Sequence, residues 1–321
     1  MTVDSIKGAL LGTAVGDALG MPVEGLSHQN VRMYYKGIKG YTADEKRGDL
    51  TAGQWTDDTQ FTFALVRVLT ASADPVELPA RVAGAYLALR PEARRWGPTS
   101  RAAIDRLAGG AAWDAAGDAA VPTNGAAMRA APLGVWWAVA GASREQAFRF
   151  IQPILKITHR HPASVAAGFG QAFVVREALR HTPATFDAGA FWAALIETTA
   201  WAEAQAGADT RVSDRLRELA HARDEFPLDL QDRCNGTGPL ADESWPFAAA
   251  MFARNPSLIE ATLLSAINVG GDADTVGAMV GAALGALHGW QAFPAAWRDG
   301  LEDVARLEAE AEALAHALGV F

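Results

Sequence analysis

Two short carboxylate clusters contain the residues best suited to chemistry. One is Trp55-Thr56-Asp57-Asp58-Thr59, and the other is Gly270-Gly271-Asp272-Ala273-Asp274-Thr275. Each cluster combines carboxylates with hydroxyl groups, and each precedes an apolar run of helical spacing, at 61–69 and 276–287. Both clusters are therefore expected at the start of a helix. The repeated arrangement predicts that they form one shared site, although they lie far apart in the sequence.

The chemistry of such a site follows from its charge. Asp57, Asp58, Asp272 and Asp274 cannot all stay ionised in one place unless cations bind or their pKa values rise. Oxygen ligands without Cys or His at ligand spacing favour Mg²⁺ or Mn²⁺ over zinc. Four carboxylates are enough for two ions, which can hold a water molecule and orient a substrate. From the residues alone, an alternative is that the carboxylates and threonine hydroxyls cap the helix starts.

Two glycine stripes belong to the helices that must position these clusters. Glycine occupies every fourth position at 8, 12, 16 and 20, and again at 277, 281, 285 and 289. A stripe of this kind leaves one helix face bare, so that a neighbouring backbone can approach closely. We therefore expect tight helix packing that brings the first and last thirds of the chain together.

The rest of the sequence predicts a nearly all-α protein. Ala, Leu, Arg and Glu dominate, and no linker, charge block or repeat divides the chain, so residues 1–321 are expected to form a single domain. Residues 21–54 and 111–122 are expected to be irregular, and the first segment is long enough to be a functional loop. The expected helices are 5–19, 57–69, 79–89, 98–107, 125–137, 143–157, 163–179, 188–205, 211–220, 244–252, 257–267, 276–287 and 300–318.

Composition limits the possible partners and the compartment. With 321 residues, half of them hydrophobic, the chain can bury a sizeable core. A net charge of −9 without a Lys/Arg-dense run argues against broad binding to nucleic acid or to an anionic membrane. Cys234 is the only cysteine, which excludes an internal disulfide and suits a reducing compartment. Because no signal peptide or membrane span is recognisable, we expect a cytoplasmic protein.

The carboxylate clusters occur together with three further motifs. These are the glycine-rich segment 8–20, Thr123-Asn124-Gly125-Ala126-Ala127-Met128-Arg129, and Thr158-His159. Taken along the chain, the two clusters and these three motifs resemble the motifs of the ADP-ribosylglycohydrolase family. They occur in the order of that family and span nearly the whole chain. The resemblance implies a compact orthogonal helical bundle with two Mg²⁺ or Mn²⁺ ions in a cleft that binds ADP-ribose. The metal ligands that it implies are Thr56, Asp57, Asp58, Asp272, Asp274 and Thr275.

The same resemblance implies roles for residues outside the metal set. It implies that Glu24 is a mobile acidic residue near the scissile bond. Glu24, Asp57 and Asp274 would be the catalytic residues. It further implies that the substrate-binding residues are Asn124, Gly125, His159 and Gly271, with Asn124 and Gly125 in a loop that contacts the diphosphate. Ala273 departs from the family pattern, because several members have Thr there, but this side chain is not among the implied ligands.

Several of these residues also have simpler interpretations. From the sequence alone, Glu24 could be a solvated surface acid, and His159 could be a helix cap or a packed core residue. Asp17 is expected to be structural and to orient a neighbouring loop. The single loop Thr123-Asn124-Gly125 is a natural phosphate cradle, because a helix start presents N–H groups to anions.

The reaction that the resemblance implies is hydrolysis of a glycosidic bond. ADP-ribose would be released from a modified protein side chain, most plausibly arginine, or from a small-molecule conjugate. The protein is expected to be a monomer.

One alternative is a non-catalytic relative that binds ADP-ribose or serves a structural, crystallin-like role. Another is a two-metal phosphoesterase, for which the two carboxylate clusters would serve equally well. The six intact ligand positions favour catalysis.

Overall fold

The computed structural model describes residues 1–207, 209–222 and 224–321. In this part of the chain the regular structure is helical, and strand pairing is limited to isolated β-bridges. The predicted all-α class is confirmed. The α-helices are α1 (Val3–Gly20), α2 (His28–Tyr35), α3 (Asp57–Ala71), α4 (Leu78–Ala88), α5 (Pro98–Ala108), α6 (Trp113–Ala116), α7 (Gly125–Met128), α8 (Ala131–Ala140), α9 (Arg144–Lys156), α10 (Pro162–Arg180), α11 (Ala188–Ala206), α12 (Arg211–Leu219), α13 (Pro227–Arg233), α14 (Ser244–Arg254), α15 (Ile259–Ile267), α16 (Ala273–His288), α17 (Ala295–Gly300) and α18 (Val304–Ala317). Short 3-10 helices cover Met21–Val23, Arg90–Glu92 and Trp290–Ala292.

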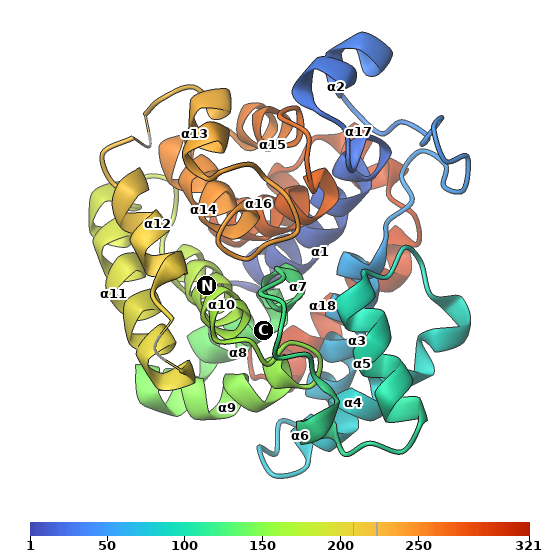
Figure 1. Cartoon of the computed structure of the whole chain (residues 1–321), viewed down its shortest axis with the longest axis vertical. Coiled ribbons are helices and arrows are strands. Elements are labelled where there is room, and N and C mark those ends of the chain that lie inside the picture. The colour runs from blue at the N-terminus through green and yellow to red at the C-terminus, as the bar shows by residue number, and fades with distance from the viewer. Residues whose placement is uncertain (208, 223) are drawn as a thin grey trace.

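Helices α1 and α16 lie side by side in the middle of the molecule (Figure 1). Their glycine stripes face each other, and the backbones are almost in contact. A Cβ atom added to Gly16 would lie 1.9 Å from the carbonyl oxygen of Gly277, and one added to Gly12 would lie 2.2 Å from that of Gly281. The expected close packing of the two stripes is confirmed. It places the end of α1 at Gly20 against Ala273, at the second carboxylate cluster.

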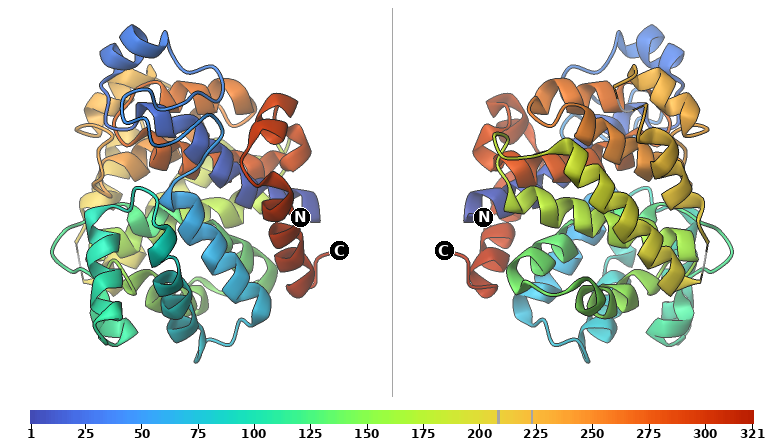
Figure 2. Two further views of the ribbon diagram at one scale, coloured as in Figure 1. Left: turned by 90° about the vertical axis from the view of Figure 1, so that its right-hand side faces the viewer. Right: turned by 90° about the vertical axis from the view of Figure 1, so that its left-hand side faces the viewer.

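The remaining helices surround this central pair and bury it. Helices α10, α14 and α15 pack against α16, while α3 and α18 pack against α1 and against each other. As a result α1 is buried from Gly8 to Gly20, and α16 is buried except at His288. Figure 2 shows α2 protruding at one end of the molecule and the two chain termini lying near each other. Helix α3 starts beside the C-terminal end of α1, where Thr56 donates a hydrogen bond to Asp17, and the first carboxylate cluster therefore lies near the second one.

Several predicted boundaries are wrong. Within 21–54, which was expected to be irregular, α2 forms because Ser27 caps its start through a hydrogen bond from the Asn30 N–H group. A single turn, α6, forms within 111–122, also expected to be irregular. The continuous helix expected over 125–137 is two helices, α7 and α8, and Pro132 lies in the first turn of α8. Two short helices, α13 and α17, were not predicted.

None of the described helices combines the length and the apolarity that crossing a lipid bilayer requires. The assignment of residues 1–321 to one domain stays a prediction.

One buried carboxylate outside the carboxylate clusters makes folding stability depend on pH. Glu203, on α11, is 1 % exposed and accepts hydrogen bonds from the N–H groups of Val212 and Ser213 at the start of α12. Burial raises its pKa from 4.5 to about 7. The folded state therefore holds an extra proton between these pH values, and stability falls as the pH rises from 4.5 to about 7.

We expect Glu203→Gln to remove this pH dependence, because glutamine resembles the protonated acid. The shift corresponds to about 3 kcal/mol between the two ends of the range. Urea unfolding of both proteins at pH 5 and pH 8 measures the effect. If the variant lost as much stability between these pH values as the parent protein does, Glu203 would not be the responsible group.

Candidate active site

The first carboxylate cluster is held by a carboxylate on another helix. Asp17, in the last turn of α1, accepts hydrogen bonds from the backbone N–H groups of Thr56 and Thr59 at 2.9 and 3.1 Å. It also accepts the Thr56 and Thr59 hydroxyls at 2.8 and 2.6 Å. Asp17 thus satisfies N–H groups at the start of α3, and the expectation that it is structural agrees with these contacts. Asp57 and Asp58 are left free of capping bonds.

The second cluster is held by two glycines with left-handed backbones. Gly270 and Gly271 have φ values of +83° and +74°, which disfavour any residue with a side chain. The Gly271 carbonyl accepts the N–H group of Gly25 at 2.7 Å, and the Gly271 N–H group donates to Leu26 at 2.8 Å. These two bonds join the loop that carries Glu24 to the loop that carries Asp272.

Capping accounts for only a small part of the contacts of the two clusters. Thr56 and Asp272 occupy the N-cap positions of α3 and α16, but neither side chain forms a capping hydrogen bond. The Thr56 hydroxyl donates to Asp17, while the Asp272 carboxylate accepts the side-chain amide of Asn124 at 2.5 Å. Asp274 does accept one first-turn N–H group, at 2.9 Å, but the two N-cap side chains are used for contacts with other segments.

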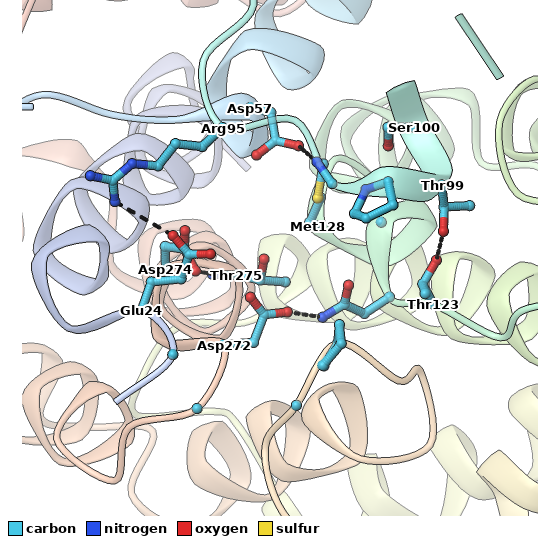
Figure 3. A pocket seen from close by; sticks show the side chains of 18 of the residues that line it. Glu24, Asp57, Arg95, Thr99, Ser100, Thr123, Met128, Asp272, Asp274 and Thr275 are labelled. Carbon is cyan, nitrogen blue, oxygen red and sulfur yellow. Dashed lines mark hydrogen bonds and ion pairs between the residues drawn. The ribbon is translucent and has the colours of Figure 1, made fainter. Parts of the chain in front are cut away.

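A cavity of about 380 Å³ lies between the two helix starts. Figure 3 shows Asp272 and Asp274 on one side of it, Glu24 beside them, Asp57 across from them and Thr123 at the far end. Of the predicted site residues, those lining the cavity are Glu24, Asp57, Asn124, Gly125, His159, Gly271, Asp272, Asp274 and Thr275. The other two, Thr56 and Asp58, are buried and do not line it.

The carboxylates form two groups with the spacing of metal ligands. Asp17, Asp58 and Asp274 offer oxygens within 4.8 Å of one another, and so do Glu24, Asp272 and Asp274. Asp274 belongs to both groups. The sequence-based ligand set did not include Asp17 or Glu24, whose side chains reach these groups only after the chain has folded. Asp57 belongs to neither group, and its carboxylate lies 3.4 Å from the Gly97 N–H group.

Four carboxylates, those of Glu24, Asp57, Asp272 and Asp274, line the cavity together with one arginine, Arg95. Burial raises the pKa values of Asp57, Asp58 and Asp274 well above the usual aspartate value, and neighbouring carboxylates raise them further. Burial also raises the pKa values of Asp17 and Asp272 to about 6. Among the described residues, the buried Asp58 Oδ1 has no hydrogen-bond partner. An unsatisfied buried carboxylate oxygen in an all-oxygen donor set fits a hard divalent cation.

Glu24 is held by two arginines. Arg47 donates to its Oε2 at 2.5 Å, and Arg95 lies 3.5 Å from the same oxygen. Arg95 also forms a 2.7 Å ion pair with Asp44, and both of these side chains are over nine-tenths buried. The interpretation of Glu24 as a solvated surface acid is therefore wrong, because its side chain is 24 % exposed and paired at the cavity.

The two arginines should differ strongly in their effect on stability. Arg95→Met leaves the Asp44 carboxylate buried without its ion partner, so we expect a loss of about 3 kcal/mol in the free energy of unfolding. Arg47 is 37 % exposed, and Arg47→Met should cost less than about 1 kcal/mol. Urea unfolding of both variants provides the measurement. Equal small losses would show that the Arg95 pair is not a buried structural contact.

The far end of the cavity contains the residues predicted to bind a diphosphate. The Asn124 side-chain amide donates to both Asp272 and Ser244, and its backbone N–H group donates to Pro239. All of the Asn124 donors are therefore used within the protein, and the residue positions Asp272. Gly125 packs against the imidazole of His159, where an added Cβ would lie 2.6 Å from Cε1.

Comparison with known proteins identifies the family. The model of the ADP-ribosylglycohydrolase family matches residues 2–320. The chain belongs to the ADP-ribosylglycohydrolase family. It is 33 % identical over 320 residues to an uncharacterized protein of Archaeoglobus fulgidus, covering 95 % of this chain and 94 % of the other. It is 26 % identical to the ADP-ribosylarginine hydrolase Tri1 of Serratia proteamaculans, covering 98 % and 79 % of the two chains.

A solved structure agrees with this family assignment. It is described as an ADP-ribosylglycohydrolase-related protein complex and superposes with a TM-score of 0.76 at 29 % identity, covering 98 % of each chain. The all-α ADP-ribosylglycohydrolase fold predicted from the motifs is confirmed, and the protein belongs with hydrolases that act on ADP-ribose conjugates.

The arginines at and near this cavity were not assigned from the sequence. Arg95 follows another arginine in an exposed-looking segment, and only its contacts with Glu24 and Asp44 show its position. Arg129 ends the motif Asn124–Arg129 and contacts His159, thirty positions later. Its place within that motif was the only signal available in the sequence.

Proposed function

We propose that this protein is a metal-dependent hydrolase that cleaves the glycosidic bond between ADP-ribose and a modified protein side chain, with arginine as the first candidate acceptor. A small-molecule ADP-ribose conjugate is the other substrate class in this proposal. The observation that carries it is the cluster of buried carboxylates on one side of the cavity, with the unsatisfied Asp58 Oδ1 beneath it. The name of the Serratia relative supports arginine as the acceptor.

The ligands we propose for two Mg²⁺ or Mn²⁺ ions are Thr56, Asp57, Asp58, Asp272, Asp274 and Thr275, with Asp17 and Glu24 near enough to contribute. When bound, such ions supply Lewis acidity and lower the pKa of a bound water molecule. Thr275 supports this set, because its hydroxyl donates to Asp58 at 3.4 Å and its N–H group donates to Asp274 at 2.9 Å.

The protein's own side chains supply orientation and proton transfer. Glu24, at the cavity and fixed by two arginines, is placed to move a proton at the leaving atom of the acceptor side chain. Asn124 fixes the orientation of the Asp272 carboxylate through their 2.5 Å hydrogen bond. Gly125, His159 and Gly271 line the cavity and form the proposed contacts to ADP-ribose.

A product assay tests the proposal. The protein is incubated with Mg²⁺ or Mn²⁺ and peptides ADP-ribosylated on arginine or on serine, with EDTA-treated protein as the control. We expect free ADP-ribose to be released from the arginine peptide only in the presence of metal. Tight ADP-ribose binding without release from either peptide would indicate a binding protein, and AMP as the product would indicate a phosphoesterase.

A further inference from the structure

Arg129 is a buried guanidinium with no carboxylate partner among the described residues. It is 3 % exposed, and its Nη1 group has no hydrogen-bond partner within the part of the chain that the structure describes. Its Nη2 group donates to the hydroxyls of Thr158 at 2.9 Å and Ser100 at 3.4 Å. The guanidinium lies over the rings of Phe61 and Tyr86, 4.4 and 5.3 Å from their centres. A buried charge without an ion partner is costly to maintain, which indicates a specific use for it.

The contact between Arg129 and His159 determines which imidazole nitrogen carries the proton. The Arg129 Nη2 group lies 3.1 Å from His159 Nδ1, and the Thr158 hydroxyl lies 2.8 Å from the same nitrogen. A guanidinium can only donate hydrogen bonds. Nδ1 must therefore be the unprotonated acceptor, and the single proton of the neutral ring lies on Nε2. Nδ1 has one lone pair, which the guanidinium and the Thr158 hydroxyl share, while the same hydroxyl can accept a hydrogen bond from Arg129.

The Nε2 edge of the ring lies against Gly125, which lines the cavity as His159 does. A Cβ added to Gly125 would lie 2.7 Å from Nε2, so only the bare glycine backbone fits beside this edge. Within the described part of the chain, no hydrogen bond uses Nε2. Burial and the charge of Arg129 both lower the pKa of His159 well below the usual histidine value, so the ring stays neutral at physiological pH.

We propose that Arg129 is a positioning residue that fixes His159 as its Nε2–H tautomer, so that the cavity presents a permanent neutral donor to an acceptor oxygen of the bound ligand. The identity of that ligand rests on the proposed function, in which it is ADP-ribose, whose diphosphate offers several acceptor oxygens. The tautomer itself does not depend on the ligand. A histidine free to exchange tautomers would instead present a lone pair to the same oxygen part of the time.

Nitrogen NMR of the Mg²⁺-loaded protein tests the tautomer directly. The protein is labelled with ¹⁵N-histidine, and the signals of His159 are identified among those of the seven histidines by their loss in His159→Phe. We expect Nδ1 to resonate as an unprotonated nitrogen and Nε2 as a protonated one between pH 6 and pH 8. A protonated Nδ1, or a ring protonated on both nitrogens, would overturn the proposal. This test needs no Arg129 variant to fold.

Two substitutions of Arg129 separate positioning from simple packing. Glutamine can donate or accept, so Arg129→Gln should produce a mixture of tautomers and weaken ADP-ribose binding about tenfold. Lysine can only donate, so Arg129→Lys should keep the Nε2–H tautomer and bind within about threefold of the parent protein.

A double-mutant cycle with His159→Phe provides the decisive control. If Arg129 acts through His159, Arg129→Gln should cause no further loss of ADP-ribose affinity when His159 is already phenylalanine. An equal loss in both backgrounds would show that Arg129 only supports the fold. If the parent protein does not bind ADP-ribose, the proposed function fails, while the NMR measurement still decides the tautomer.

Discussion

Asp274→Asn is expected to eliminate ADP-ribose release while leaving the metal-free protein folded and at least as stable as the parent. Asp274 is the one carboxylate common to both ligand groups, so its loss should disturb the binding of both proposed ions. Several kcal/mol of transition-state stabilisation should disappear, which corresponds to a loss of kcat/KM on the order of a thousandfold. Stability should not fall, because the neutral amide removes a buried like charge from a crowded cluster.

Two measurements check this expectation. Steady-state kinetics with an ADP-ribosylated arginine peptide gives the loss of activity, and thermal unfolding with and without Mn²⁺ gives the stability. The parent protein should gain thermal stability from Mn²⁺ and the variant should not. Asp105→Asn is the control, because Asp105 is an exposed aspartate that pairs with Arg90 on the surface. Unchanged turnover in Asp274→Asn would contradict the proposed metal site.

The second large effect is on folding. Gly281→Ala places a Cβ atom 2.1 Å from the carbonyl oxygen of Gly12, and neither helix backbone can move aside without opening the centre of the molecule. Overpacking a core usually costs about 1 to 3 kcal/mol, but a clash between two backbones leaves no side chain to adjust. We expect a loss of more than about 4 kcal/mol, which is enough to abolish expression of folded protein.

The matched control is the same substitution in another helix. Gly84 lies in α4, and an added Cβ would meet no atom within 4 Å. Gly84→Ala should therefore stabilise the protein by about 0.5 to 1 kcal/mol, because alanine favours the helix more than glycine does. Urea unfolding of both variants gives the comparison. Similar stability of the two variants would show that the central helices are not held at backbone contact.

The sequence allowed the central helices and the two carboxylate clusters to be predicted. The glycine stripes specify close packing without any side-chain detail, so the pairing of α1 with α16 followed from spacing alone. The clusters could be placed together because each starts a helix and their residues match family motifs. The left-handed turn at Gly270 and Gly271, which precedes Asp272 and Asp274, is local in the sequence.

The parts that could not be predicted depend on contacts between distant segments. Asp17 holds Thr56 and Thr59, but nothing in the sequence near Asp17 indicates these partners. Helix α2 was missed because glycines and a proline surround it and make the whole segment 21–54 read as irregular. The hydrogen bonds of Asn124 could not be predicted either. Its N–H groups donate to Asp272, Ser244 and Pro239, so they are already used within the protein and not directed at a diphosphate.

Titration of metal-stripped protein with Mn²⁺ tests the central claim most directly, when bound Mn²⁺ and ADP-ribose release from an ADP-ribosylated arginine peptide are followed in the same samples. The account predicts that two ions bind per chain and that release, absent in EDTA, appears as these sites fill. Full release from protein that holds no bound metal would contradict it.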